Sequence, residues 1–118
     1  MTIQQCYEAF GGNYQEVISR LRADERVARF LQKVVDDGSY KLLIESIESG
    51  NGEEAFRAAH TLKGVCANLS ITKLGESSSA LTEALRGLVI TDAVQPLLQQ
   101  VKEDYQLTIN CIKQLSNQ

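Results

Sequence analysis

The sequence has few of the residues on which most catalytic and metal sites depend. It contains one histidine, one proline, no tryptophan and three cysteines. Cys6, Cys66 and Cys111 form no Cys-x-x-Cys pair, which argues against a disulfide framework and against a zinc site. A single histidine does not provide the base–nucleophile relay of a hydrolase. Neither a Gly-x-x-x-x-Gly-Lys-Ser/Thr loop nor a Gly-x-Gly-x-x-Gly loop is present, so we expect no nucleotide site.

Charge and hydropathy exclude two further classes of partner. The net charge is −3, whereas binding to a phosphate backbone needs a basic face, so we expect no nucleic-acid partner. No run approaches the ~18 apolar residues of a membrane-spanning helix, and the N-terminus lacks a charged segment followed by an apolar one. We therefore expect one soluble, cytoplasmic domain over residues 1–118, monomeric by default and without a membrane partner.

Apolar residues recur at steps of three and four along the chain, and no segment alternates as a strand. Asn13 with Glu16 three residues later is typical of a capping box, and Asp24 is expected to cap the following helix. Four further helices are expected to begin at Ser39, near Glu53, near Ile71 (with a seam to Leu88) and at Thr91 or Asp92. The pattern predicts an all-α fold, in which an antiparallel four-helix bundle (39–116) is covered on one side or end by short N-terminal helices (1–37).

The histidine lies on the outer side of one of these helices. At ~100° per residue, the apolar seam of the helix over 53–69 consists of Ala55, Ala59, Leu62, Cys66 and Leu69. His60 falls roughly 130° from the middle of that seam. A neutral imidazole is a good nucleophile near neutral pH. We therefore interpret His60 as a candidate reactive group on a docking surface.

Two neighbours of His60 strengthen this interpretation. Gly64 lies four residues later on the same face, although glycine inside a helix costs roughly 1 kcal/mol relative to alanine. A glycine at this position leaves room for a partner beside the imidazole. Lys63, three residues after His60, can reach an anion attached to the ring.

The segment His60-Thr61-Leu62-Lys63-Gly64, preceded by Phe56-Arg57-Ala58-Ala59 and followed by Ala67-Asn68-Leu69, resembles the signature of the histidine phosphotransfer (HPt) domains of bacterial phosphorelays. The stretch 74–86, LGESSSALTEALR, resembles the next helix of that family, and the resemblance covers about residues 39–116. Val65 and Cys66 depart from the small residues that usually follow Lys-Gly, and Ser70 stands where many members have glycine.

The resemblance implies a phosphoryl carrier in a two-component signalling pathway. His60 would accept a phosphoryl group from the aspartyl phosphate of a response-regulator receiver domain and pass it to another receiver, with a hybrid or other sensor histidine kinase upstream. Helical spacing places no carboxylate pair near His60, which suits a carrier because a general base would favour attack by water. We expect no enzyme activity, metal or cofactor of its own, and Mg²⁺ would come from the partner receiver.

The residues suggest a role for each member of the candidate site. Lys63 would neutralise phosphate charge. Gly64 and Ala67 would let the partner approach closely, and Arg57 and Asn68 border the same face as candidate partner contacts.

Three interpretations remain open at this stage. The protein could be a non-catalytic helical interaction module of the same fold. His60 could instead bind a metal or haem, although cofactor ligands of helix bundles normally point inward. The basic face formed by Arg22, Arg26, Arg29 and Lys33 is either merely solvated or attracts an acidic partner.

Overall fold

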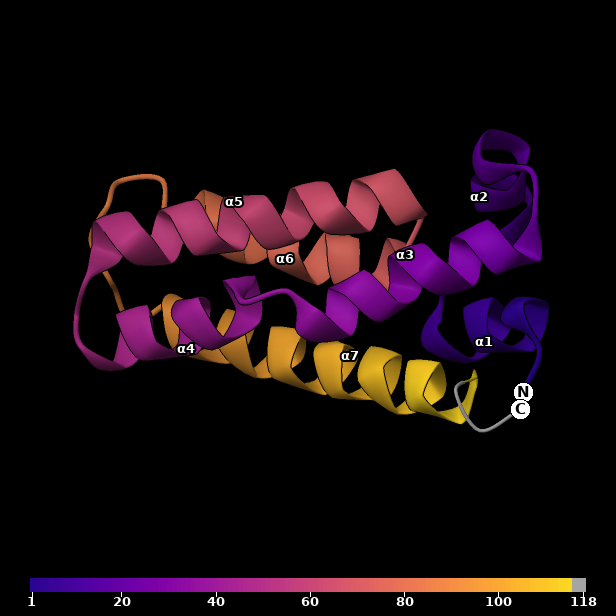
Figure 1. Cartoon of the computed structure of the whole chain (residues 1–118). Coiled ribbons are helices and arrows are strands. Elements are labelled where there is room, and N and C mark those ends of the chain that lie inside the picture. Colours follow the sequence, from indigo (N-terminus) through magenta and orange to yellow (C-terminus); the bar gives the residue numbers. More distant parts are fainter. Residues whose placement is uncertain (116–118) are drawn as a thin grey trace.

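The computed structural model describes residues 1–115, and within them the chain forms seven α-helices and no strand (Figure 1). The helices are α1 (Ile3–Phe10), α2 (Tyr14–Leu21), α3 (Asp24–Asp36), α4 (Ser39–Glu48), α5 (Gly52–Leu69), α6 (Thr72–Ala84) and α7 (Val94–Leu115). This confirms the predicted all-α helical bundle with additional short helices at the N-terminus.

The bundle is antiparallel and elongated, with principal extents of 41 × 25 × 19 Å. Helix α5 packs against α4 and α6, and α6 packs against α7 (Figure 1). The rings of Tyr40 on α4 and Tyr105 on α7 stack with centroids 3.7 Å apart, which joins the first and last helices of this set. The predicted seam of α5 is buried throughout its length, as are Cys66 and Cys111.

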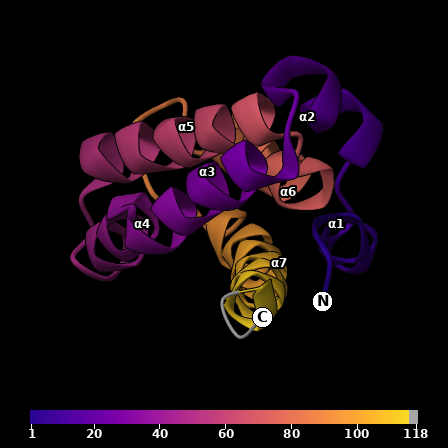
Figure 2. The same cartoon turned by 45° about the vertical axis from the view of Figure 1, so that its right-hand side comes forward.

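One side of the bundle is made jointly by α3 and α4. Helix α4 has 10 residues and α5 has 18, so α4 alone covers only part of its neighbour. Helix α3 fills the remaining length and packs against both α5 and α7 (Figures 1 and 2). The buried residues of α3 are Val27, Leu31 and Val34.

Three local predictions need correction. Asn13 caps α2 by accepting a hydrogen bond from the Glu16 N–H, but the Glu16 carboxylate turns to Ser70 and Arg20 instead of closing a capping box. Asp24 is the first residue of α3 rather than its cap, and it accepts a hydrogen bond from the Tyr14 hydroxyl. The seam of α6 ends before Leu88, which is exposed and has a φ of 64° in the turn after the helix.

The N-terminal helices hold the C-terminal end of α5. The Arg20 guanidinium donates to the Asn68 carbonyl at 2.8 Å and to the Ser70 hydroxyl at 2.6 Å. The buried Tyr7 hydroxyl donates to the Leu69 carbonyl at 2.7 Å. The last carbonyls of a helix have no partner within it, so these bonds, together with the positive charge of Arg20, stabilise the end of α5.

The connection between α1 and α2 passes close to this helix end at Gly12. A Cβ at this position would lie 2.6 Å from the Tyr7 ring, 2.7 Å from the Phe10 ring and 2.8 Å from the Ser70 carbonyl oxygen. A Cβ at Gly38, in contrast, would meet no atom within 4 Å. Of these two glycines, only Gly12 is therefore required for packing.

We predict that Gly12→Ala destabilises the protein, because the added methyl group must displace buried rings and backbone. Overpacking of this kind costs about 1–3 kcal/mol. Gly38→Ala is the matched control and should change the stability by less than about 1 kcal/mol. Urea denaturation followed by circular dichroism measures both. Equal stability of the two variants would contradict this close approach.

Candidate functional site

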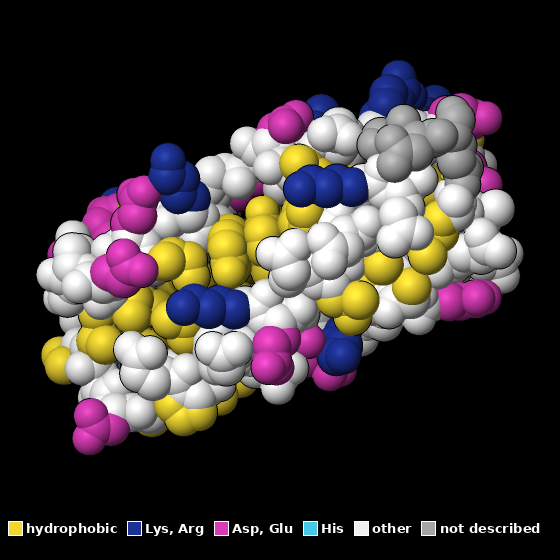
Figure 3. Space-filling view, turned by 90° about the horizontal axis from the view of Figure 1, so that it is seen from below, with side chains coloured by type: hydrophobic (Ala, Val, Ile, Leu, Met, Phe, Trp, Pro, Cys, Tyr) yellow, Lys and Arg dark blue, Asp and Glu magenta, His cyan; other side chains and the backbone are white. Residues whose placement is uncertain are grey.

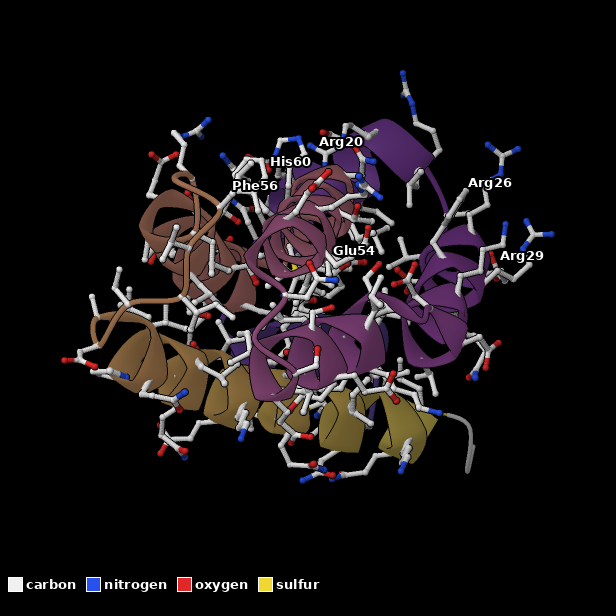
Figure 4. All side chains as sticks on the ribbon, turned by 90° about the vertical axis from the view of Figure 1, so that its left-hand side faces the viewer. Arg20, Arg26, Arg29, Glu54, Phe56 and His60 are labelled. Atoms are coloured by element: carbon white, nitrogen blue, oxygen red, sulfur yellow. The ribbon has the colours of Figure 1, made fainter. Side chains whose placement is uncertain are left out.

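His60 projects from the outer side of α5, as its position in the helix predicts (Figure 4). The side chain is exposed, whereas its chain neighbour Ala59 is fully buried. The imidazole stacks on the ring of Phe56, one turn earlier, with centroids 6.1 Å apart and an interplanar angle of 19°. The ring is therefore accessible from solvent on one side and supported on the other.

A cation from the turn that follows α6 completes this support. The Arg86 guanidinium carbon lies 5.5 Å from the centroid of the Phe56 ring. Arg86 also forms a bidentate ion pair with Glu83, with N–O distances of 2.6 and 3.1 Å. Sequence reasoning assigned no role in the site to Phe56, Glu83 or Arg86. The four-residue spacing of Phe56 and His60 could have revealed the stack, whereas the contribution from α6 depends on tertiary packing.

Lys63 lies partly buried at the edge of α5 that faces α6. It lines an open depression of about 340 Å³ together with Cys66, Ala67, Gly75 and Ser79, among others. The small side chains of α6 allow this close packing, since a Cβ on Gly75 would lie only 3.3 Å from the Cys66 Cβ. Among residues 1–115, no acidic group forms an ion pair with Lys63.

The charge of Lys63 nevertheless acts on Glu83. The pKa of the Glu83 carboxyl is lowered, mainly by its hydrogen bond and ion pair with Arg86 and to a smaller extent by Lys63. Helical spacing places only Glu53 near the face of His60, so this second carboxylate near the site comes from α6. Burial raises the pKa of the Cys66 thiol to about 12, so it stays protonated near neutral pH and is a poor nucleophile.

The exposed residues that follow His60 form a continuous strip along α5. We call His60, Gly64, Ala67 and Asn68 the His60 strip, and all four are exposed. Gly64 has an ordinary helical backbone without a positive φ, and a Cβ there would meet no atom within 4 Å. Internal packing therefore does not explain this glycine.

Unlike the other predicted partner contacts, Arg57 forms ion pairs within its own helix. Its guanidinium pairs with Glu54 at 2.6 Å and with Glu53 at 3.6 Å, both on the first turn of α5. The pairing directs Arg57 toward the beginning of the helix and away from Gly64. A role in partner binding stays a prediction for Arg57, as it does for Asn68 and Ala67.

The far end of the His60 strip is bounded by Arg20 and Ser70. Ser70 has a φ of 55°, in the left-handed region that favours glycine. Here the Ser70 hydroxyl donates to Glu16 at 2.6 Å and accepts from Arg20, which offsets the cost of the strained backbone. Helical spacing gave no signal for Arg20, because its partners lie 47 to 50 residues later.

The described part of the chain lacks two features that bear on the classes of function considered above. Over residues 1–115, no group of three or more His, Cys, Asp and Glu side chains could hold a metal ion. No helix in the same range has the length and apolar character needed to cross a membrane.

Comparisons with known proteins identify the family. Neither curated proteins nor solved structures give a significant match. The sequence model of the Hpt domain matches residues 14–117, which is nearly the whole chain and begins at α2 rather than near residue 39. The chain therefore belongs to the Hpt domain family, whose members carry phosphoryl groups in phosphorelays and bind receiver domains and kinases.

Proposed function

We propose that His60 accepts a phosphoryl group from the aspartyl phosphate of a receiver domain and passes it to a second receiver in a two-component phosphorelay. The observation that carries the proposal is the setting of His60, the one histidine of the sequence, on an exposed strip beside the unobstructed Gly64. A sensor histidine kinase, hybrid or other, would supply the phosphate upstream.

The transfer requires little chemistry from this chain. The lone pair of the neutral His60 Nε2 attacks phosphorus, the N–P bond forms, and the P–O bond to the aspartate breaks with its electron pair left on the carboxylate. The second transfer reverses these steps on another receiver. Lys63 would neutralise the equatorial oxygens, and Mg²⁺ would be supplied by the receiver that binds it.

The carboxylates near His60 favour a carrier over a hydrolase. Glu53 and Glu54 are paired with Arg57, and Glu83 is paired with Arg86. A carboxylate held by a guanidinium is a weaker general base, because protonating it would cost the ion pair. These three carboxylates would therefore be poor activators of water beside a phosphorylated His60, which would help the phosphoryl group to persist until a receiver docks.

The Phe56 stack supports the same role. The ring restricts the rotation of the imidazole, and the Arg86 cation keeps Phe56 in place. A nucleophile that is held in one orientation loses less entropy when it reaches the in-line geometry. We propose Phe56 and Arg86 as positioning residues, and we propose that the protein acts as a cytoplasmic monomer without a cofactor of its own.

We predict that His60→Gln abolishes phosphorylation while leaving the fold intact, because the side chain is exposed. The measurement is labelling by a phosphorylated receiver, with the phosphate tested for acid lability and base stability. Circular dichroism and the melting temperature of the variant should match the wild type. Stable folding of the wild type without any phosphate on His60 would instead indicate a non-catalytic interaction module.

Lys63→Ala should slow the transfer to His60 about tenfold or more, since a charge-assisted contact contributes roughly 1.5–3 kcal/mol. Rapid-quench measurement of the transfer rate checks this expectation. Lys41→Ala is the control, because Lys41 is an exposed lysine on α4 whose ion pair within residues 1–115 is with Glu45. Equal rates for the two variants would reduce Lys63 to a solubilising residue.

Gly64→Gln should impair transfer strongly without loss of stability, because its side chain would project beside His60 into space that a receiver needs. Gly64→Ala separates the two effects: it should stabilise the protein by up to ~1 kcal/mol and should impair transfer far less. Thermal denaturation and transfer kinetics are measured on both variants. Unfolding of Gly64→Gln would show that this glycine is needed for packing.

A further inference from the structure

Three arginines form no ion pair with an acidic side chain among residues 1–115: Arg22, which caps the end of α2, and Arg26 and Arg29 on α3. Arg20, Arg57 and Arg86 each form an ion pair with a glutamate. Among residues 1–115, Arg26 and Arg29 have no such partner, and both point into solvent (Figure 4). Together with Lys33, they form an uncompensated positive patch on a chain whose net charge is −3.

An aromatic side chain lies in the middle of this patch. Phe30 is 40% exposed, and the Lys33 ammonium lies 5.0 Å from its ring centroid. Arg26 and Arg29 line a depression of about 480 Å³ beside the same ring. We call Arg26, Arg29, Phe30 and Lys33 the α3 face. A large apolar ring surrounded by unpaired cations is typical of a protein-binding surface.

The α3 face continues into the His60 strip. A second depression, of about 210 Å³, lies between the two helices. It is lined by Phe30, Lys33 and Val34 of α3, by Asp37 directly after that helix, and by Val65, Asn68 and Leu69 of α5. Asn68 is also a member of the His60 strip. A partner that reaches His60 can therefore extend over Asn68 onto Phe30 without crossing an intervening helix.

Figure 3 shows the side on which α7 lies, where Lys and Arg side chains lie beside Asp and Glu side chains around an exposed band of apolar side chains, and no histidine is visible. That side therefore lies away from His60, whereas the α3 face adjoins the His60 strip.

We propose that the receiver domain docked at His60 also binds the α3 face, through an acidic surface that places an apolar side chain against Phe30. This inference rests on the proposed phosphotransfer function and adds the chemistry of the partner. Unpaired cations attract carboxylates over several ångströms in dilute salt, which raises the rate of encounter. The seated apolar group then slows dissociation.

The test compares two double variants of equal charge. Arg26→Glu/Arg29→Glu changes the α3 face, and Lys41→Glu/Lys102→Glu changes two lysines on α4 and α7. Each double variant takes the net charge from −3 to −7.

Receiver domains are phosphorylated with acetyl phosphate, and the one that labels wild-type His60 fastest is used. The KM for this receiver should rise about tenfold in the α3 variant at low salt, with kcat unchanged, and the difference should shrink in 0.5 M NaCl. The control should stay within about twofold of wild type. Equal KM values for the two double variants would overturn the proposal.

A third variant tests the apolar part of the surface. Phe30→Ala should raise the KM at both salt concentrations, and Phe30→Leu should restore most of the loss because leucine also fills the depression. A KM unchanged in Phe30→Ala would overturn the apolar contact.

Chemical phosphorylation of His60 with phosphoramidate separates this proposal from the underlying function. It should proceed equally in all these variants, because it needs no receiver. If phosphoramidate labels the wild type and no receiver does, the proposed donor is wrong. If a receiver labels wild type and α3 variant alike, only the α3 face is wrong.

Discussion

The position of α5 depends on the hydrogen bonds made by its last carbonyl groups. Those of Cys66 and Ala67 accept from the backbone of the turn at residues 70 and 71, and the carbonyls of Asn68, Leu69 and Ser70 accept from Arg20, Tyr7 and Asn13. All five groups are thereby paired by the turn, by helices α1 and α2, or by the connection between those two helices. Because an unpaired buried carbonyl costs about 1–3 kcal/mol, the N-terminal segment is part of the domain rather than an addition to it. The family match from residue 14 agrees with this arrangement.

The glycines at the ends of α5 and the glycine in its middle differ in the space that a side chain would find there. Gly12 and Gly52 are required because other backbone or rings occupy the space a side chain would need, at the α5 C-terminus and at its N-terminus respectively. Gly64 has no such neighbour, so its cost to helix stability is not offset inside the molecule. The ends of α5 are fixed by close packing while its middle is left open. An open, rigid middle is what a nucleophile needs if a large partner must reach it.

Much of this site could be predicted from periodicity. The buried seam of α5, the outward direction of His60 and the space around Gly64 follow from 3.6 residues per turn, and each is local to one helix. The contact of Arg86 with the Phe56 ring, the Arg20 contact and the joint role of α3 and α4 could not be predicted, because each links segments far apart in the chain. The error at Asp24 has a related cause: its carboxylate is taken by Tyr14, and a tertiary or neighbouring contact outweighs the local capping preference.

The contacts of the N-terminal helices with α5 also fix the position of the α3 face relative to the His60 strip. Arg20 on α2 binds the end of the His60 strip, and α3 begins three residues after α2 ends. Helix α3 in turn packs on α5 and α7, so the spacing between Phe30 and His60 is set by buried contacts and not by a loop. For a receiver that binds both the His60 strip and the α3 face, the two surfaces would already be in place, and little binding free energy would be lost in ordering them. Under the proposed docking on α3, that contact would orient the incoming phosphate at His60, and a site with one lysine and one histidine would then achieve in-line transfer.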